Sequence, residues 1–307
     1  MACTLTAEQI KQVKPLGFLH NKGTNLFNGR IITANGKITA AQTAAVALAA
    51  EKFGNGEVEF TTRLSIEVRG IPFAQIEAFR QFIASVGLET GGTGSVVRPV
   101  VSCKGTTCQY GLYDTFALSQ KIHEQFYKGY QTVQLPHKFK IAVGGCPNNC
   151  VKPTLNDLGI VGQLVPRVDK EMCRGCKKCQ IEAACPMHAP RFADDGVMHI
   201  HEEICNHCGR CVKKCPFNAI KSGTPGYRVY IGGRWGKQTA HGKPLHKIFT
   251  SEEELLRVVD KAILLFREQG KTGERFAQTI DRLGFENVEK QLLSDEILQR
   301  KQQILDA

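Results

Sequence analysis

The chain has 307 residues, of which 42% are hydrophobic and 22% are charged, as in an ordinary globular protein that buries a sizeable core. It holds no apolar run of roughly eighteen residues and no signal-peptide pattern at its start, so we expect no membrane span and a cytoplasmic location. The net charge is +11. Because the basic residues form no long run, we favour a polyanionic cofactor or an anionic substrate over nucleic acid as its cause.

The first segment, roughly residues 1–165, is predicted to be mixed α/β. Thr39 and Gln42 have capping-box spacing, which predicts a helix that ends at Gly54. Strict alternation over 57–70 predicts a strand. One face of that strand would carry Val58, Phe60, Leu64, Ile66 and Val68, and the other would carry Thr61, Arg63, Ser65 and Arg69. Further helices are expected at 72–87 and 113–128, and a strand at 139–143.

Two more segments follow. Residues 166–222 lack regular periodicity and hold eight cysteines. A strand is expected from about residue 226, and then a helix in which Ser251 and Glu254 have capping-box spacing. The apolar residues on one face of this helix are Leu255, Val258, Val259, Ala262, Ile263 and Phe266. One or two helices are expected after it.

Eight of the thirteen cysteines form two runs, and without an export signal we do not expect disulfides. The run from Cys205 to Cys215 has the C-x2-C-x2-C-x3-C-P spacing of bacterial ferredoxins, in which the fourth cysteine binds the other cluster. This predicts one [4Fe-4S] cluster on Cys173, Cys176, Cys179 and Cys215, and a second on Cys185, Cys205, Cys208 and Cys211. Structural zinc is the alternative, but zinc sites usually present two cysteine pairs separated by a long spacer.

Four other cysteines form two isolated pairs, Cys103 with Cys108 and Cys146 with Cys150. Apart from Cys3, which we interpret as a free N-terminal thiol, no other cysteines are left to complete a four-ligand site. Glycines and polar residues around each pair favour loops beside a cofactor. We therefore predict a third iron–sulfur cluster, with four unrelated buried thiols as the alternative.

With these cysteines, four further stretches resemble the siroheme-dependent sulfite and nitrite reductases. The stretches are FNGRIITANGKITAAQ, FTTRLSIEVRGI, LPHKFKIAVGGC and YIGGRWGK. The resemblance covers nearly the whole chain and is greatest to the siroheme-bearing C subunit of anaerobic sulfite reductases. One departure is the x4 spacing of the first isolated cysteine pair, where many members have x5.

The resemblance implies an α+β fold in three parts. Residues 1–95 would form a ferredoxin-like half-domain, and residues 96–165 with 223–307 would form a siroheme and [4Fe-4S] domain. Residues 166–222 would be an inserted ferredoxin domain with two [4Fe-4S] clusters. The expected cofactors are therefore siroheme and three [4Fe-4S] clusters.

The resemblance also implies roles for individual residues, because siroheme is a polycarboxylate and sulfite is a small oxyanion. Arg30, Arg63, Lys138 and Lys140 would form the anion pocket above the siroheme iron. Alternation places Lys138 and Lys140 on one face of a strand. Cys150 would bridge the cluster to siroheme. The other candidates for siroheme contacts are Thr61, Thr62, Arg69, Arg98, Asn149, Arg234 and Lys237.

The implied function is reduction of sulfite to sulfide by a catalytic subunit, with electrons relayed through the two ferredoxin clusters. No G-x-G-x-x-G opens a helix after a strand, so a partner would supply the electrons. The resemblance implies that this partner is a set of donor subunits with flavin and iron–sulfur groups, or ferredoxin. The chain could work in a homo- or hetero-oligomer. Siroheme nitrite reductase remains open, as does a non-catalytic electron-transfer subunit, although a relay alone needs no anion pocket. We expect neither a nucleic-acid nor a membrane partner.

Overall fold

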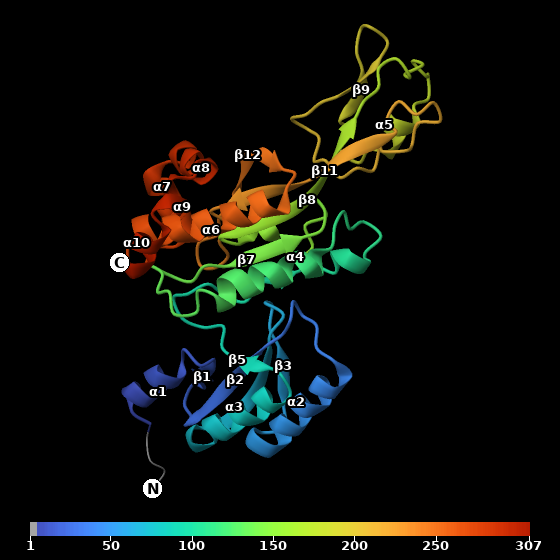
Figure 1. The fold of residues 1–307 in the computed structure, drawn as a ribbon. Helices are drawn as coiled ribbons and strands as arrows, with labels where there is room; N and C mark the ends of the chain where they lie inside the picture. The colour runs from blue at the N-terminus through green and yellow to red at the C-terminus, as the bar shows by residue number, and fades with distance from the viewer. Residues whose placement is uncertain (1–4) are drawn as a thin grey trace.

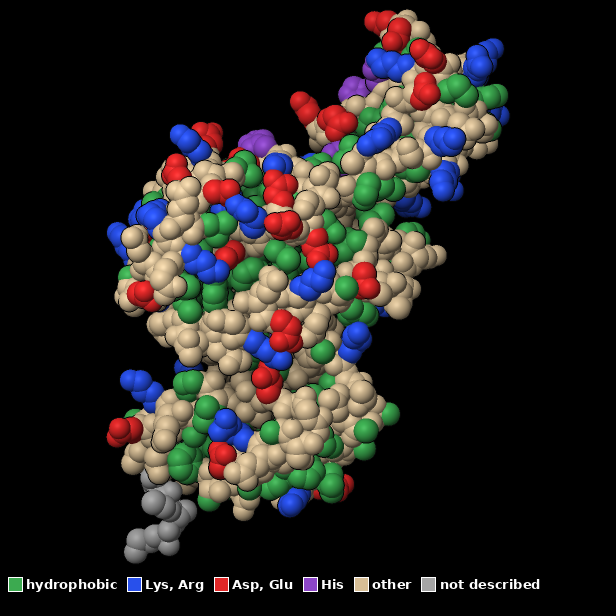
Figure 2. Space-filling view, viewed as in Figure 1, with side chains coloured by type: hydrophobic (Ala, Val, Ile, Leu, Met, Phe, Trp, Pro, Cys, Tyr) green, Lys and Arg blue, Asp and Glu red, His purple; other side chains and the backbone are tan. Residues whose placement is uncertain are grey.

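The computed structural model describes residues 5–307 and shows two five-stranded sheets with a smaller third part (Figure 1). The free thiol predicted at Cys3 lies outside the described residues. Side chains of both charge signs are interspersed over the visible face of the first two units (Figure 2). No helix within residues 5–307 is long and apolar enough to cross a membrane.

The N-terminal unit is an antiparallel sheet with strand order β1-β2-β4-β3, and β5 also pairs with β2. Helices α2 and α3 pack beside each other against the sheet (Figure 1). Its elements are α1 (Ala7–Val13), β1 (Phe18–His20), β2 (Leu26–Ile32), α2 (Ala40–Phe53), β3 (Val58–Phe60), β4 (Ile66–Pro72), η1 (Phe73–Gln75), α3 (Ile76–Ser85) and β5 (Glu89–Thr90). The core is apolar and includes three phenylalanines that are fully buried, Phe18, Phe27 and Phe79.

The capping box predicted at Thr39 and Gln42 is confirmed, and Gly54 caps the end of α2. The single strand predicted over 57–70 is wrong, because the chain reverses there and forms the β3–β4 hairpin. The amide of Thr61 donates to the carbonyl of Ser65, and Leu64 adopts φ +61° in the turn. Phe60, which was predicted to share one face with Val68, is 84% exposed, whereas Val68 is fully buried.

The central unit is a mixed sheet with strand order β12-β11-β8-β7-β6, in which β6, β7 and β8 are parallel. Helices α4 and α6 lie on the same side of this sheet, where Lys121 at the end of α4 pairs with Glu252 at the start of α6 (Figure 1). Its elements up to the end of the sheet are β6 (Val101–Ser102), η2 (Gly105–Thr107), α4 (Thr115–Ile122), the π-helical turn η3 (His123–Lys128), β7 (Ile141–Gly144), η4 (Pro153–Leu155), β8 (Leu158–Arg167), β11 (Ser222–Ile231) and β12 (Lys243–Phe249). The strand predicted at 139–143 thus begins two residues later.

Five helices follow the sheet: α6 (Glu252–Gln269), α7 (Phe276–Leu283), α8 (Phe285–Leu293), α9 (Glu296–Gln299) and α10 (Lys301–Asp306). Ser251 caps α6, and the whole predicted apolar face of that helix is buried. Lys261, Leu264 and Leu265 are buried as well, because α8, α9 and α10 cover α6 from further sides. Where one or two helices were expected after α6, the chain forms four.

The third part extends from the central sheet on the long ribbon of β8 and β11, which pair from Leu158 with Ile231 to Arg167 with Ser222 (Figure 1). It holds α5 (Gln180–Ala184) and a two-stranded sheet of β9 (Pro190–Phe192) and β10 (Met198–Ile200). Its hydrophobic core is small and is formed by Ile181, Met198, Cys211, Ala219 and Ile220. A part that buries so little apolar surface needs other stabilising interactions to stay folded.

Candidate functional site

Arg63 joins the N-terminal unit to the central unit. It stands in the turn between β3 and β4, where its amide donates to the Thr61 hydroxyl at 3.3 Å. Its guanidinium donates to the side-chain oxygen of Asn156 at 3.0 Å and to the carbonyl of Pro99 at 2.9 Å. Arg63 therefore reaches the centre of the molecule from a turn and not from the polar face of a strand.

Arg30 and Arg98 meet at one backbone carbonyl. Arg30 on β2 pairs with Glu67 at 2.6 Å and donates to the carbonyl of Gly92 at 3.2 Å. Arg98 donates to the same carbonyl. Two guanidinium groups on one acceptor lie close together, and only Glu67 makes an ion pair with either of them among the described residues.

Lys138 and Lys140 precede β7, and the alternation predicted for them holds, since Phe139 and Ile141 are fully buried between and after them. Asp157 immediately precedes β8 and is fully buried. Its carboxylate accepts a hydrogen bond from the amide of Lys140 at 2.9 Å. Both carboxylate oxygens of Asp157 accept from Arg275, at 2.9 and 2.8 Å. This fixes the segment that carries Lys140 against the start of α7.

These six cations form one group, which we call the cationic centre: Arg30, Arg63, Arg98, Lys138, Lys140 and Arg275. Burial lowers the pKa of both Arg63 and Arg98 to about 10, with neighbouring guanidinium groups adding to the effect. Burial, then Arg63 and Arg275, lower the pKa of Lys140 to about 8. The pKa of Lys140 is thus closer to neutral pH than that of an ordinary lysine, so its ammonium group can release a proton more readily.

The cationic centre has hydrogen-bond donors without a partner among the described residues. The Nε atoms of Arg63, Arg98 and Arg275 are buried without a hydrogen-bond partner in the described part of the chain. Buried polar groups are normally satisfied, so such donors mark a place for a ligand. Excess positive charge and free N–H groups fit a bound group that carries several carboxylates, and they equally fit a small oxyanion.

The remaining predicted siroheme contacts differ in position. Arg69 pairs with Glu57 at 2.8 Å and Glu59 at 3.3 Å in the β3–β4 hairpin and does not join the cationic centre. Alternation had placed it on the face of Arg63, but the turn breaks that alternation. Thr61 holds the turn by a 2.7 Å hydrogen bond to the Ser65 hydroxyl, and Thr62 is exposed.

Arg234 and Lys237 lie in a loop that packs beside the cysteine-bearing loop after β7. The amide of Gly242 donates to the carbonyl of Thr154 at 2.7 Å, and Lys152 lies 6.0 Å from the ring centre of Trp235. The Nε of Arg234 is buried without a partner among residues 5–307, whereas Lys237 is exposed.

Cys103, Cys108, Cys146 and Cys150 come together at one edge of the central sheet. Cys103 follows β6 and Cys146 follows β7, and the carboxyl ends of parallel strands meet at the same edge. The amide of Gly145 donates to the Cys103 sulfur at 3.2 Å. Burial raises the pKa of the Cys146 thiol, and the other three thiols raise it further because they lie close by.

Cys150 differs from the other described cysteines, since it alone among residues 5–307 is exposed. The left-handed backbone of Asn149 (φ +60°) and Lys152 (φ +50°) holds this loop away from regular structure. The side-chain oxygen of Asn149 is buried without a partner in the described residues. The Cys150 sulfur can therefore reach a group that lies outside the set of four thiols.

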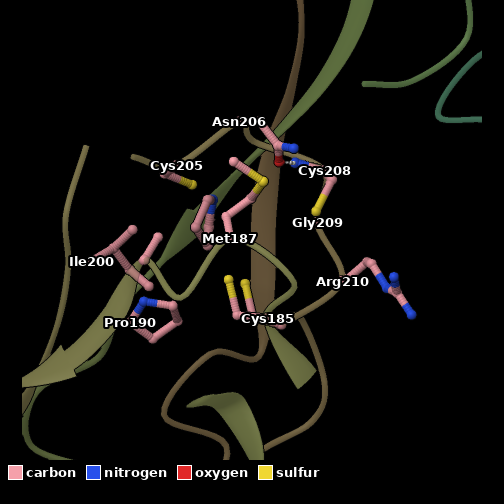
Figure 3. A pocket seen from close by; sticks show the side chains of 12 residues that line it. Cys185, Met187, Pro190, Ile200, Cys205, Asn206, Cys208, Gly209 and Arg210 are labelled. Atoms are coloured by element: carbon pink, nitrogen blue, oxygen red, sulfur yellow. Dashed lines mark hydrogen bonds between the residues drawn. The ribbon is translucent and has the colours of Figure 1, made fainter. Parts of the chain in front are cut away.

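A second set of four cysteines lines one hollow at the base of the third part: Cys185, Cys205, Cys208 and Cys211. In Figure 3 the sulfurs of Cys185, Cys205 and Cys208 point inward toward a shared space. Burial raises the pKa of Cys211 to about 12, and the three neighbouring thiols add to this. The structure thus groups Cys185 with the second cysteine run, as the ferredoxin spacing had predicted.

The loop that carries these thiols is anchored on β8. The amide of Leu164 donates to the carbonyl of His207 at 2.7 Å, and the buried His207 ring contacts Gln163 and Glu202. Gly209 has φ +71°, and a Cβ there would lie 2.6 Å from the Leu164 side chain. A glycine is therefore required for this close approach.

All four cysteines of the third set are partly buried. Cys173, Cys179 and Cys215 pack against the small core of the third part, with Cys176 between the first two in sequence. Within residues 5–307, no three cysteine, histidine or carboxylate side chains come close enough to share a single metal ion. The thiols of each set are thus spread around a space and not gathered at one point.

The first two sets adjoin each other. One pocket is lined on one side by Tyr110, Cys146 and Asn148, and on the other by Cys208 and Arg210. Loops from the central unit and from the third part therefore face each other at this pocket, each carrying a cysteine of its set.

The sequence did not reveal Arg275 of the cationic centre or Asp157, the carboxylate that holds Arg275. Arg275 and Asp157 are 118 positions apart and belong to no recognisable motif. Only the packing of α7 against the start of β8 brings them together.

Two family profiles match the chain. The nitrite and sulphite reductase 4Fe-4S domain covers residues 93–301, and the nitrite/sulfite reductase ferredoxin-like half domain covers residues 19–86. A relative from Methanocaldococcus jannaschii with no characterised function is 34% identical over 84% of this chain and 88% of its own length.

Two relatives with named activities are longer. Coenzyme F420-dependent sulfite reductase of Methanocaldococcus jannaschii is 32% identical over 75% of this chain and 36% of its own length. The C subunit of the anaerobic sulfite reductase of Salmonella typhimurium is 31% identical over 46% of this chain and 44% of its own length. The chain therefore aligns with less than half the length of either.

Two solved structures share the fold. Dissimilatory sulfite reductase I superposes with a TM-score of 0.69 and 23% identity, over 87% of this chain and 69% of that one. The Mycobacterium tuberculosis NirA protein superposes with a TM-score of 0.67 and 14% identity, over 96% of this chain and 48% of that one. The predicted α+β reductase fold is confirmed by these similarities.

Proposed function

The chain belongs to the siroheme-dependent nitrite and sulfite reductase family of oxidoreductases, and from that premise we propose that it reduces sulfite to sulfide at a siroheme bound beside the cationic centre. The observation that carries the proposal is the group of six partly buried cations, three of them with unpaired Nε donors, which lies between the N-terminal unit and the central unit that also carries Cys150. A subunit that only relayed electrons would have no use for it.

Siroheme, when bound, supplies the iron that takes sulfite and passes electrons to it. The residues of this chain do the rest. Arg63 and Arg98 keep their charge at neutral pH even with the pKa lowered to about 10, so they can bind carboxylates and sulfite oxygens throughout. Their hydrogen bonds to backbone and Asn156 fix their direction before substrate arrives, which favours transition-state stabilisation.

Lys138 and Lys140 are proposed to supply protons, since each sulfite oxygen must leave as water. The pKa of Lys140 is lowered to about 8, nearer to neutral pH, where a general acid can both lose and regain its proton. The buried Asp157 holds the Lys140 amide and Arg275 together. We therefore assign Asp157 as a positioning residue for the proton donor.

Three [4Fe-4S] clusters are proposed to bring electrons in. The set of Cys103, Cys108, Cys146 and Cys150 would hold the cluster joined to siroheme through Cys150. The pocket shared by Cys146 and Cys208 supports a relay in which the cluster on Cys185, Cys205, Cys208 and Cys211 delivers electrons to it. The cluster on Cys173, Cys176, Cys179 and Cys215 would then come first. The division into three domains with an inserted ferredoxin is part of this proposal.

The test is anaerobic production of the whole chain, an iron count, and sulfide formation with reduced methyl viologen. Iron equal to three four-iron clusters and one siroheme is expected. Cys150→Ser should abolish sulfide formation and change the siroheme absorbance, whereas Cys3→Ser, the matched control, should retain both. A Cys150→Ser protein with full activity and an unchanged spectrum would refute the bridge.

Nitrite is measured in the same assay, because the cationic centre accepts either oxyanion. Sulfite as the faster substrate at equal concentration supports the proposal. Faster ammonia formation from nitrite would assign the chain to nitrite reduction instead.

A further inference from the structure

Seven cations surround the outermost set of cysteines on the third part. They come from two adjacent segments, residues 169–178 and 212–221, which are joined by a 2.8 Å hydrogen bond from the Asp169 amide to the Ala219 carbonyl. We call them the cationic face, and all are exposed: Lys170, Arg174, Lys177, Lys178, Lys213, Lys214 and Lys221. These segments contain only two carboxylates, Asp169 and Glu171.

The cationic face is not neutralised by the chain itself. Within residues 5–307, none of its seven side chains forms a salt bridge, although ion pairs are frequent elsewhere on the surface. In Figure 2 several Lys and Arg side chains gather along the right and lower border of the third part, and Asp and Glu side chains lie along its top and left. Basic side chains therefore predominate along that border of the visible face.

Apolar side chains lie within the cationic face. Met172 is 37% exposed and Phe217 is 43% exposed, and each is next to a cysteine of the outer set or its following proline. A groove beside them is lined by Val168, Met172, Asn218 and Lys221. Exposed apolar groups with a charged rim are the usual make-up of a protein-docking surface.

The cationic face also surrounds the place where electrons would enter. Arg174 lies between Cys173 and Cys176, and Lys177 and Lys178 lie between Cys176 and Cys179. Any protein seated on these side chains would lie directly over this set of thiols. The other two sets are farther in, at the base of the third part and on the central sheet.

We propose that the cationic face docks a small acidic electron-carrier protein with an iron–sulfur cluster, which delivers electrons to the outer cysteine set. This inference rests on the proposed function, since it takes that set to be the first cluster of the relay. A negative partner matches the seven unpaired cations, and long-range attraction would speed repeated encounter and release. Each delivery oxidises the carrier by one electron and reduces the chain by one.

The experiment measures binding of an acidic two-cluster bacterial ferredoxin to the intact, cluster-loaded chain by calorimetry. The variant is Lys177→Glu with Lys178→Glu, and the control is Lys22→Glu with Lys290→Glu, two exposed lysines on distant elements with the same total charge change. At about 50 mM salt we expect the dissociation constant to rise at least about tenfold in the variant and to stay near wild type in the control. At about 500 mM salt the wild-type advantage should largely disappear.

Equal binding by variant and control would overturn the proposal, as would salt-dependent binding of a short DNA duplex by a wild-type chain that ignores the ferredoxin. Sulfide formation with reduced methyl viologen is measured on the same preparations. A wild-type chain that binds ferredoxin through Lys177 and Lys178 but makes no sulfide would contradict the proposed function and leave the docking surface standing.

Discussion

The cationic centre and the cationic face use the same two residue types in different surroundings. In the centre, burial and mutual repulsion lower the pKa of Arg63, Arg98 and Lys140, and one fully buried carboxylate, that of Asp157, holds part of the group in place. On the face, the side chains stand in water and are held by no carboxylate of the described chain. In the proposed function, the partly buried cations of the centre would bind a small anion, whereas the exposed cations of the face would attract a large one.

The comparison predicts that the centre depends on its carboxylate for stability. Asp157→Asn would leave the Arg275 guanidinium buried without its ion-pair partner, since the pair is 2.8 Å long and the two side chains are 0% and 11% exposed. We expect a loss of about 3–5 kcal/mol in the free energy of unfolding, measured by urea denaturation of the cofactor-free protein.

The matched control is Glu268→Gln, which removes a half-exposed ion pair with Arg300. Its expected cost is below about 1 kcal/mol, because water screens such pairs. If the two variants lost the same free energy of unfolding, the ion pair in the cationic centre would contribute no more to stability than a surface pair. The contrast between the centre and the surface would then be wrong.

A smaller effect is expected at Lys140, where function opposes stability. Because its pKa is lowered to about 8 in the folded chain, the unfolded chain binds more protons between pH 8 and the ordinary lysine pKa near 10.5. Lys140 therefore destabilises the fold below pH 8, and this cost is relieved as the pH rises through that range. Lys140→Met should raise the melting temperature of the cofactor-free protein at pH 7 by about 1–3 °C.

The gain should shrink toward pH 10.5, and sulfide formation by the cofactor-loaded variant should be strongly reduced. Lys290→Met, an exposed lysine on α8, should change neither quantity. A melting temperature that fell in Lys140→Met at pH 7 would show that the lysine stabilises the fold, against the direction of its pKa.

Local features of this fold could be predicted from the sequence, and those created by packing could not. The α2 cap at Thr39 and the spacing within each cysteine run depend on residues a few positions apart. The β3–β4 turn was missed because Leu64 adopts a left-handed backbone that its residue type does not favour. Arg275 was missed because its role depends on Asp157, which only the folded chain brings near.

The same distinction holds within the site. Lys138 and Lys140 could be placed on one side of their segment by alternation alone, whereas Arg69 could not be excluded, since alternation carries no information about a turn. The exposure of Cys150, which distinguishes it among the described cysteines, follows from the loop and not from the C-x3-C spacing.

The central claim, that siroheme and sulfite meet at the cationic centre, is tested most directly by titrating sulfite into the anaerobic, cofactor-loaded protein and following the siroheme absorption bands. The wild type should show a saturable shift, and Arg63→Met should need about 100-fold more sulfite or show none, while Lys22→Met titrates like the wild type. An identical titration for Arg63→Met at unchanged siroheme content, or the absence of siroheme bands from the wild type, would contradict the account.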